Sequence, residues 1–238
     1  MPKIRKTPGR PAHTASGATG LSREQVVAEA LNVLRTDGLS GLTTRRVATR
    51  LNVMSPALYW HVRNKDELLQ LVADAICAEM VLPRKEWSFR KRLATIANEY
   101  RRVLIAYRDG ARLFAEQPPT GPHRMKLYDA AVEAFFDAGF QVSEAIAMAT
   151  FYRHYLLGMV TEETRGHAKE PGSVVFPVAT LGVELQHLGM KSAEYPSLAH
   201  AAAQLGKIQP EALFTAGLKV ILDGLEFRKA ELNRRKAR

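Results

Sequence analysis

Cysteine is nearly absent from this chain of 238 residues: Cys77 stands alone, so no disulfide can form within one molecule. A chain without disulfides fits a reducing compartment, and we expect a cytoplasmic protein. Cys77 falls in a helically spaced apolar row with Val72, Ile76 and Met80. This row predicts a small buried side chain and not a reactive thiol.

Long hydrophobic runs are missing as well. The most apolar stretch, residues 145–160, is interrupted by Arg153 and His154, which argues against a membrane-spanning helix. The basic N-terminus has no apolar segment behind it, which predicts that no signal peptide is present. With 46% hydrophobic residues, the chain has the composition of a soluble globular protein with a substantial core, and no membrane partner is expected.

The signatures of common enzymes and metal sites are also lacking. There is no His-Glu-x-x-His spacing, no glycine-rich phosphate loop after a strand and no Gly-x-Ser-x-Gly elbow. The seven histidines are scattered, and most of them, His123 included, are expected to face solvent. We therefore predict that the protein is not an enzyme and has no catalytic residues, metal ligands or cofactor. Because sustained two-residue alternation of apolar side chains is missing too, an all-α fold is favoured.

Positive charge is abundant and unevenly placed along the chain. The net charge is +10; residues 1–65 hold 11 lysines and arginines against three acids, residues 66–227 hold 17 against 20, and the tail from 228 holds six against one. A cationic excess at one end of a chain is the electrostatic footprint of a nucleic-acid-binding segment. A solvated basic face explains the C-terminal tail adequately, but it explains the N-terminal third less well.

Residues 42–65 predict two short helices with a tight turn between them. Thr43 can cap the first helix, in which apolar residues then recur three to four positions apart. Asn52 tolerates the left-handed conformation that ends a helix. Ser55 and Pro56 restart a helix, as an N-cap followed by proline at the first helical position. This is the helix-turn-helix arrangement, whose second helix enters the major groove of DNA.

The second predicted helix has an apolar and a polar side. If Leu58 and Val62 point inward, Ser55, Ala57, Tyr59, Trp60 and His61 are left near the exposed side. Basic residues flank them at Arg45, Arg46, Arg50, Arg63 and Lys65. Cations position a protein on phosphates, while short polar and aromatic side chains can touch base edges, so the segment predicts DNA binding. Trp60 could alternatively be an anchor of the core.

Three short sequences, Thr43-Thr44-Arg45, Leu51-Asn52-Val53 and the run from Pro56 to Lys65, resemble the DNA-binding domain of the TetR family of bacterial transcriptional regulators, with the Tet repressor branch most similar. The resemblance is dense over residues 21–80. By it, the DNA-contacting residues are Thr43, Thr44, Arg45, Ser55, Pro56, Ala57, Tyr59, Trp60, His61 and Lys65. Ser55 and Ala57 stand where the Tet repressor has a glutamine and a threonine, so its operator sequence is not carried over.

Three parts of the chain are expected. Residues 1–20 form a basic arm too poor in apolar side chains to fold, residues 21–66 the three-helix helix-turn-helix domain, and residues 67–238 a helical ligand-binding and dimerisation domain. The arm carries Lys3, Arg5, Lys6 and Arg10, which either reach an adjacent minor groove or only raise local DNA affinity. Beyond the motif, helices are expected over 22–37, 66–80, 88–107, 111–115, 122–138, 143–166, 178–188 and 210–235.

The C-terminal region resembles the Tet repressor type of domain more weakly, through residues 107–111, 153–162 and 217–226. The resemblance implies a homodimer in which two helices of each subunit form a four-helix bundle. The last helix indeed has more apolar residues than one side of a monomer needs. A two-fold dimer also suits DNA reading, because recognition helices about 34 Å apart meet successive major grooves of a palindrome.

A sensor pocket is expected where aromatic and apolar residues collect with a few polar groups. The candidate pocket residues are Tyr100, Leu104, Phe114, Met148, Phe151, Tyr152, His154, Tyr155, Met159 and Glu162. The resemblance matches His154 and Glu162 to polar pocket positions, whereas Phe114 stands where the family has a metal-chelating histidine. An apolar or aromatic effector without metal is therefore predicted. The same residues could instead be only core and dimer interface.

These features together predict a ligand-responsive transcriptional regulator. The specific hypothesis is a repressor that binds a palindromic double-stranded DNA operator as a homodimer and is released by a small-molecule effector. An activator, or an effector-independent DNA-binding protein of the same fold, is the alternative. A non-specific DNA-packaging protein fits less well, because the large neutral-to-acidic C-terminal region adds mass without adding phosphate affinity.

Overall fold

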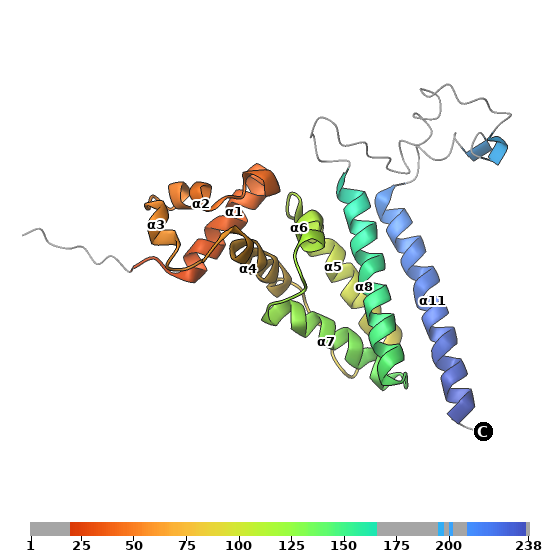
Figure 1. The fold of residues 1–238 in the computed structure, drawn as a ribbon. Helices are drawn as coiled ribbons and strands as arrows, with labels where there is room; N and C mark the ends of the chain where they lie inside the picture. Colours follow the sequence, from red (N-terminus) through yellow and green to blue (C-terminus); the bar gives the residue numbers. More distant parts are fainter. Residues whose placement is uncertain (1–19, 166–194, 198–199, 202–208, 237–238) are drawn as a thin grey trace, which may run out of the picture.

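The computed structural model describes residues 20–165, 195–197, 200–201 and 209–236 (Figure 1). These ranges contain helices and no strand, which confirms the all-α prediction. The helices are α1 (Arg23–Gly41), α2 (Thr44–Arg50), α3 (Ser55–Leu58), α4 (Lys65–Ala78), α5 (Phe89–Ile105), α6 (Gly110–Glu116), α7 (Pro122–Asp137), α8 (Val142–Arg165) and α11 (Pro210–Lys236). The predicted helix at 178–188 and the cations of the basic arm lie outside the described residues.

Helices α1 to α3 form a head at one end of the molecule, and α4 leads from it into the remaining helices (Figure 1). Helix α1 begins with a capping box, in which Ser22 and Gln25 exchange side-chain and backbone hydrogen bonds. Its regular part ends at Gly38, whose φ of 74° lies in the left-handed region that favours glycine. The apolar side chains Val26, Ala30 and Leu34 of α1 are fully buried.

The helix-turn-helix forms largely as the sequence predicts. The amide of Arg46 donates to Thr43 Oγ1 at 3.1 Å, and Asn52 adopts a φ of 54° after α2. The prediction that Ser55 caps α3 is wrong: Met54 precedes the helix, and no side chain caps it. A proline in the first turn has no N–H to satisfy, so α3 starts without a cap.

Helix α4 lies between the head and the rest of the molecule. Asn64 caps it by accepting from the amide of Glu67 at 2.8 Å, and the Glu67 carboxylate accepts from the amide of Arg63. Val72, Ala73 and Ile76 of α4 are fully buried in a core that runs continuously from α1 to α8. Helix α4 therefore packs both on the head and on the group of helices that follow it, α5 to α8 and α11, which we call the body.

The lone thiol is buried in α4, as predicted. Burial raises the pKa of Cys77 to about 12, and the negative charge of Asp74 acts in the same direction. Cys77 is thus a thiol, not a thiolate, at neutral pH.

Substitution of Leu58 tests how much the packing of α3 on the core contributes to the stability of the protein. Leu58→Ala empties a fully buried site and should lower the free energy of unfolding by about 2–5 kcal/mol. Met54→Ala, at an exposed position beside it, should change it by less than about 0.5 kcal/mol. Urea denaturation at equal protein concentration measures both, and equal midpoints for the two variants would contradict this packing.

Candidate DNA-binding surface and ligand pocket

The recognition segment at α3 places two aromatic side chains on the surface of the head. Leu58 and Val62 are buried as predicted, whereas Tyr59 is 53% and Trp60 is 89% exposed. Trp60 is therefore not an anchor of the core. Large exposed aromatic residues next to buried leucine and valine give this segment one face toward the protein and another available to a partner.

The ten predicted DNA-contacting residues lie on α2, α3 and the turns beside them, and none is fully buried. The exposed ones are Arg45, Pro56, Tyr59, Trp60 and Lys65, and the half-buried ones are Thr43, Thr44, Ser55, Ala57 and His61. The structure thus brings all ten to one end of the molecule. Their contacts with DNA stay a prediction.

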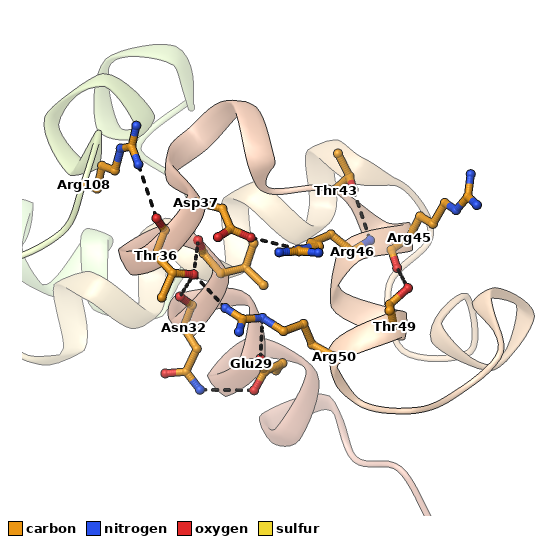
Figure 2. A network of polar contacts seen from close by, with 11 residues as sticks. Glu29, Asn32, Thr36, Asp37, Thr43, Arg45, Arg46, Thr49, Arg50 and Arg108 are labelled. Atoms are coloured by element: carbon orange, nitrogen blue, oxygen red, sulfur yellow. Dashed lines mark hydrogen bonds and ion pairs between the residues drawn. The ribbon is translucent and has the colours of Figure 1, made fainter. Parts of the chain in front are cut away.

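The arginines of α2 divide into two kinds, which the sequence alone did not distinguish (Figure 2). Arg46 Nε lies 2.8 Å from Asp37 Oδ2, and Arg50 donates to Thr36 at 2.7 Å and pairs with Glu29 at 3.3 Å. These bonds hold α2 against α1, and the hydrogen bond from Arg46 lowers the pKa of the Asp37 carboxyl. The Arg45 side chain instead points away from this network.

The end of α1 is attached to the turn between α5 and α6. Asp109 Oδ2 accepts from the amide of Leu39 at 2.9 Å. Figure 2 shows the neighbouring contact, in which Arg108 donates to the carbonyl of Thr36 at 3.3 Å. A Cβ at Gly38 would lie 2.6 Å from the Asp109 carboxylate, so only glycine permits this close approach. The head therefore contacts the body at a second place besides α4.

A cavity opens between α5, α7, α8 and the segment from α6 to α7. Its volume is about 40 Å³, within a cleft whose empty space, open mouth included, is about 490 Å³. The lining residues are Ile96, Tyr100, Phe114, Pro119, Arg124, Leu127, Tyr128, Ala131, Ala149, Tyr152, Arg153 and Leu156. A ligand of drug size must move some of these side chains to enter.

Three of the ten predicted pocket residues, Tyr100, Phe114 and Tyr152, line this cavity. Leu104 is buried elsewhere in the core, and Phe151 and His154 are exposed. The predicted residues that are half-buried outside the lining are Met148, Tyr155, Met159 and Glu162. The contribution of α7 was missed, although its lining residues at 124, 127, 128 and 131 have the spacing of one helical face.

Aromatic rings and their hydroxyl groups shape the cavity wall. The rings of Tyr100 and Phe114 meet edge to face with centroids 5.8 Å apart. Tyr152 donates to the carbonyl of Leu93 at 2.8 Å, and the hydroxyls of Tyr128 and Thr150 lie 2.9 Å apart. Burial raises the pKa of Tyr152, so it is a neutral donor.

Asp74 joins the connecting helix α4 to the pocket helix α7. Its carboxylate is nearly buried and accepts from the amides of His123 and Arg124, each at 2.9 Å. The Nδ1 atom of His123, expected only to face solvent, lies 2.8 Å from the same carboxylate while its side chain stays 45% exposed. A Cβ at Gly121 (φ 109°) would lie 2.5 Å from Asp74 Oδ1, so glycine permits this approach.

Within residues 20–165, 195–197, 200–201 and 209–236, no three histidine, cysteine or acidic side chains gather closely enough to hold a metal ion. No helix of these ranges has both the length and the apolar character needed to cross a bilayer.

The Asp74 contacts predict a measurable loss of stability. Asp74→Ala leaves the buried amides at the start of α7 without an acceptor, which should cost about 1–3 kcal/mol of unfolding free energy. Asp74→Asn keeps an acceptor oxygen and should lose less. The control is Asp129→Ala, at an exposed position of α7. Urea midpoints equal for Asp74→Ala and Asp129→Ala would show that the cap contributes nothing.

Comparisons with known proteins agree with this architecture. Residues 26–72 match the family described as bacterial regulatory proteins, tetR family, and residues 82–228 match the tetracyclin repressor-like C-terminal domain. The chain is 37% identical over 216 residues to the class A tetracycline repressor protein from transposon 1721 of Escherichia coli, covering 89% of this chain and 93% of that protein. It is 35% identical over 212 residues to the class C repressor of Escherichia coli, covering 87% and 91%.

Solved structures give the same result. The structure of apo ActR from Streptomyces coelicolor matches with a TM-score of 0.76 and 25% identity, covering 90% of this chain and 99% of that one. TetR from Acinetobacter baumannii AYE matches with a TM-score of 0.63 and 29% identity, covering 88% and 98%. The head with its helix-turn-helix, the helical body and these matches identify the chain as a member of the TetR family of ligand-responsive transcriptional repressors.

Proposed function

We propose that the protein represses transcription by binding a palindromic operator as a homodimer, and that a small aromatic effector entering the cavity between α5, α7 and α8 releases it. The observation that carries the proposal is the connection from head to cavity: α4 packs on the head, and its Asp74 caps α7, which lines the cavity. A regulator needs such a connection, because an effector acts only through a difference in affinity between two states.

The charges and aromatic groups of the head support operator binding. The guanidinium of Arg45 has no ion pair within the described residues and points away from the protein, so it is available to a phosphate. Tyr59 and Trp60 project from the recognition segment, where they can contact sugar and base edges. Arg46 and Arg50 hold α2 in place, which keeps the segment in a fixed orientation.

The outer faces of α8 and α11 support the homodimer. Helix α11 turns Phe214, Leu218 and Leu222 toward the core, yet it leaves Val220 and Phe227 exposed. Helix α8 likewise exposes apolar residues at Val142, Ile146 and Phe151. Apolar surface of this extent on two long helices is typical of an interface between subunits. Two subunits would present two heads to successive major grooves.

The small volume of the cavity supports a switch. Because its volume is only about 40 Å³, an effector must displace lining side chains of α5, α7 and α8 to be accommodated. Movement of α7 pulls on Asp74 and therefore on α4, which would change the distance between the two heads. Operator binding and effector binding would then oppose each other.

Relatives of known structure support an effector of small-molecule size. ActR was solved in complex with actinorhodin, and a TetR variant from Acinetobacter baumannii was solved in complex with minocycline. In this chain Phe114 lies in the cavity wall, where the resemblance would place a metal-chelating histidine. We therefore propose an aromatic effector that binds without a metal ion.

The DNA-binding half of the proposal is tested with an operator that the protein itself selects from a random duplex pool. Arg45→Ala should weaken binding to it about tenfold and reduce the slope of log affinity against log salt by about 1, since one phosphate contact is lost. Tyr59→Ala should also weaken binding without lowering the melting temperature, because its side chain is exposed.

Arg84→Ala is the matched control, since it removes an exposed arginine outside the head. Failure to enrich any DNA sequence would contradict the proposed function. Wild-type affinity in Arg45→Ala and Tyr59→Ala would remove these two residues from the DNA-binding surface.

A further inference from the structure

As far as the structure describes it, the cavity wall carries two positively charged side chains and no negatively charged one. Of its twelve described lining residues, two are arginines, Arg124 and Arg153, and none is an aspartate or a glutamate. Within the described ranges, neither guanidinium has a carboxylate at ion-pair distance; their recorded partners are carbonyl oxygens and the imidazole of His154. Two cations in a mostly apolar cleft create a potential that favours an anion.

The guanidinium of Arg124 is held in place at the cavity wall and contributes one of the two positive charges. It is only 6% exposed, and its guanidinium lies 4.6 Å from the centroid of the Phe114 ring. It donates to the carbonyl oxygens of Phe114, Gln117 and Pro118 at 2.8–3.3 Å. These acceptors are neutral, so they hold the guanidinium without cancelling its charge. Burial lowers the pKa of Arg124, but a guanidinium stays protonated in proteins.

Arg153 is the cation that is free to engage a ligand. One of its terminal nitrogens lies 2.9 Å from Nε2 of the adjacent His154, and this is its only recorded polar contact in the described part of the chain. The planar guanidinium has five donors, so most of them remain available. A carboxylate can accept two of them side by side.

Tyr100 supplies a hydroxyl group to the same cavity. The residue is 4% exposed, and no described residue forms a hydrogen bond with its hydroxyl, although the ring packs against Phe114. Burial raises the pKa of Tyr100, while the charges of Arg124 and Arg153 act in the opposite direction, so the three groups interact electrostatically. The hydroxyl is open to the cavity, so it can donate to an anionic acceptor that binds there.

We propose that the effector is an aromatic carboxylate, whose ring system lies among the aromatic side chains of the cavity and whose carboxylate binds Arg153 and the Tyr100 hydroxyl in the field of Arg124. The inference rests on the proposed function, because it names the ligand class of the same site. A single negative charge fits best: Arg124 is already committed to carbonyl oxygens, and the apolar lining penalises a strongly hydrated phosphate dianion.

The test compares two probes of nearly the same shape, 2-naphthoate and its neutral amide 2-naphthamide. Isothermal titration calorimetry on the full-length protein at pH 7.5, where a carboxylic acid is ionised, gives both affinities. We expect the acid to bind at least about tenfold more tightly than the amide, which corresponds to one charge-assisted contact.

Three variants assign the preference to particular groups. Arg153→Gln should reduce acid affinity about tenfold and leave amide affinity unchanged, and Arg153→Lys should restore part of it, since it keeps the charge but loses the planar fork. Tyr100→Phe keeps the ring contact with Phe114 and should weaken acid binding by about threefold to tenfold. Lys126→Gln is the control, because it removes one positive charge from an exposed position of α7 outside the cavity.

Three results would overturn the inference: equal affinities for acid and amide, equal losses in Arg153→Gln and Lys126→Gln, or no binding of either probe at millimolar concentration. Operator binding of the wild type, measured without any probe, separates this inference from the proposed function. Intact operator binding with no preference for the acid contradicts the ligand class alone. A wild-type protein that shows no preference for its operator over other DNA contradicts the proposed function as a transcriptional regulator.

Discussion

One buried carboxylate, that of Asp74, joins the helix that carries the head to a helix that lines the pocket. It lies on α4 and accepts the first free amides of α7, where the partial positive charge of the helix also favours an anion. The next turns of α7 supply Arg124, Leu127 and Tyr128 to the cavity wall. Under the proposed switch, a shift of α7 that keeps these hydrogen bonds displaces α4 as well.

Besides its packing on α4, the head contacts the body at the turn between α5 and α6. Asp109 adopts a left-handed conformation at the start of α6 and directs its carboxylate to the amide of Leu39 at the end of α1. Within the head, Arg46 and Arg50 fix α2 to α1. The recognition segment therefore belongs to a head that contacts α4 on one side and the α5–α6 turn on the other.

Local interactions made much of the fold predictable. The Thr43 cap and the left-handed Asn52 depend on residues within a few positions, so the sequence indicated them directly. The pocket depends on the relative positions of four helices, α5 to α8, which no local sequence pattern contains, and seven of its ten predicted residues lie elsewhere. The Asp74–His123 contact spans 49 positions, and no local pattern could reveal it.

The central claim, that effector binding moves the two heads through α4, is tested by the distance between them. Ala28→Cys places an exposed thiol on α1 for spin labelling, while buried Cys77, with its pKa raised to about 12, stays unlabelled. Pulsed electron paramagnetic resonance on the dimer gives the label separation with operator and with a compound that releases it. The account predicts a change of several ångströms in the wild type and a smaller one in Asp74→Ala. The same separation in both states of the wild type would contradict it.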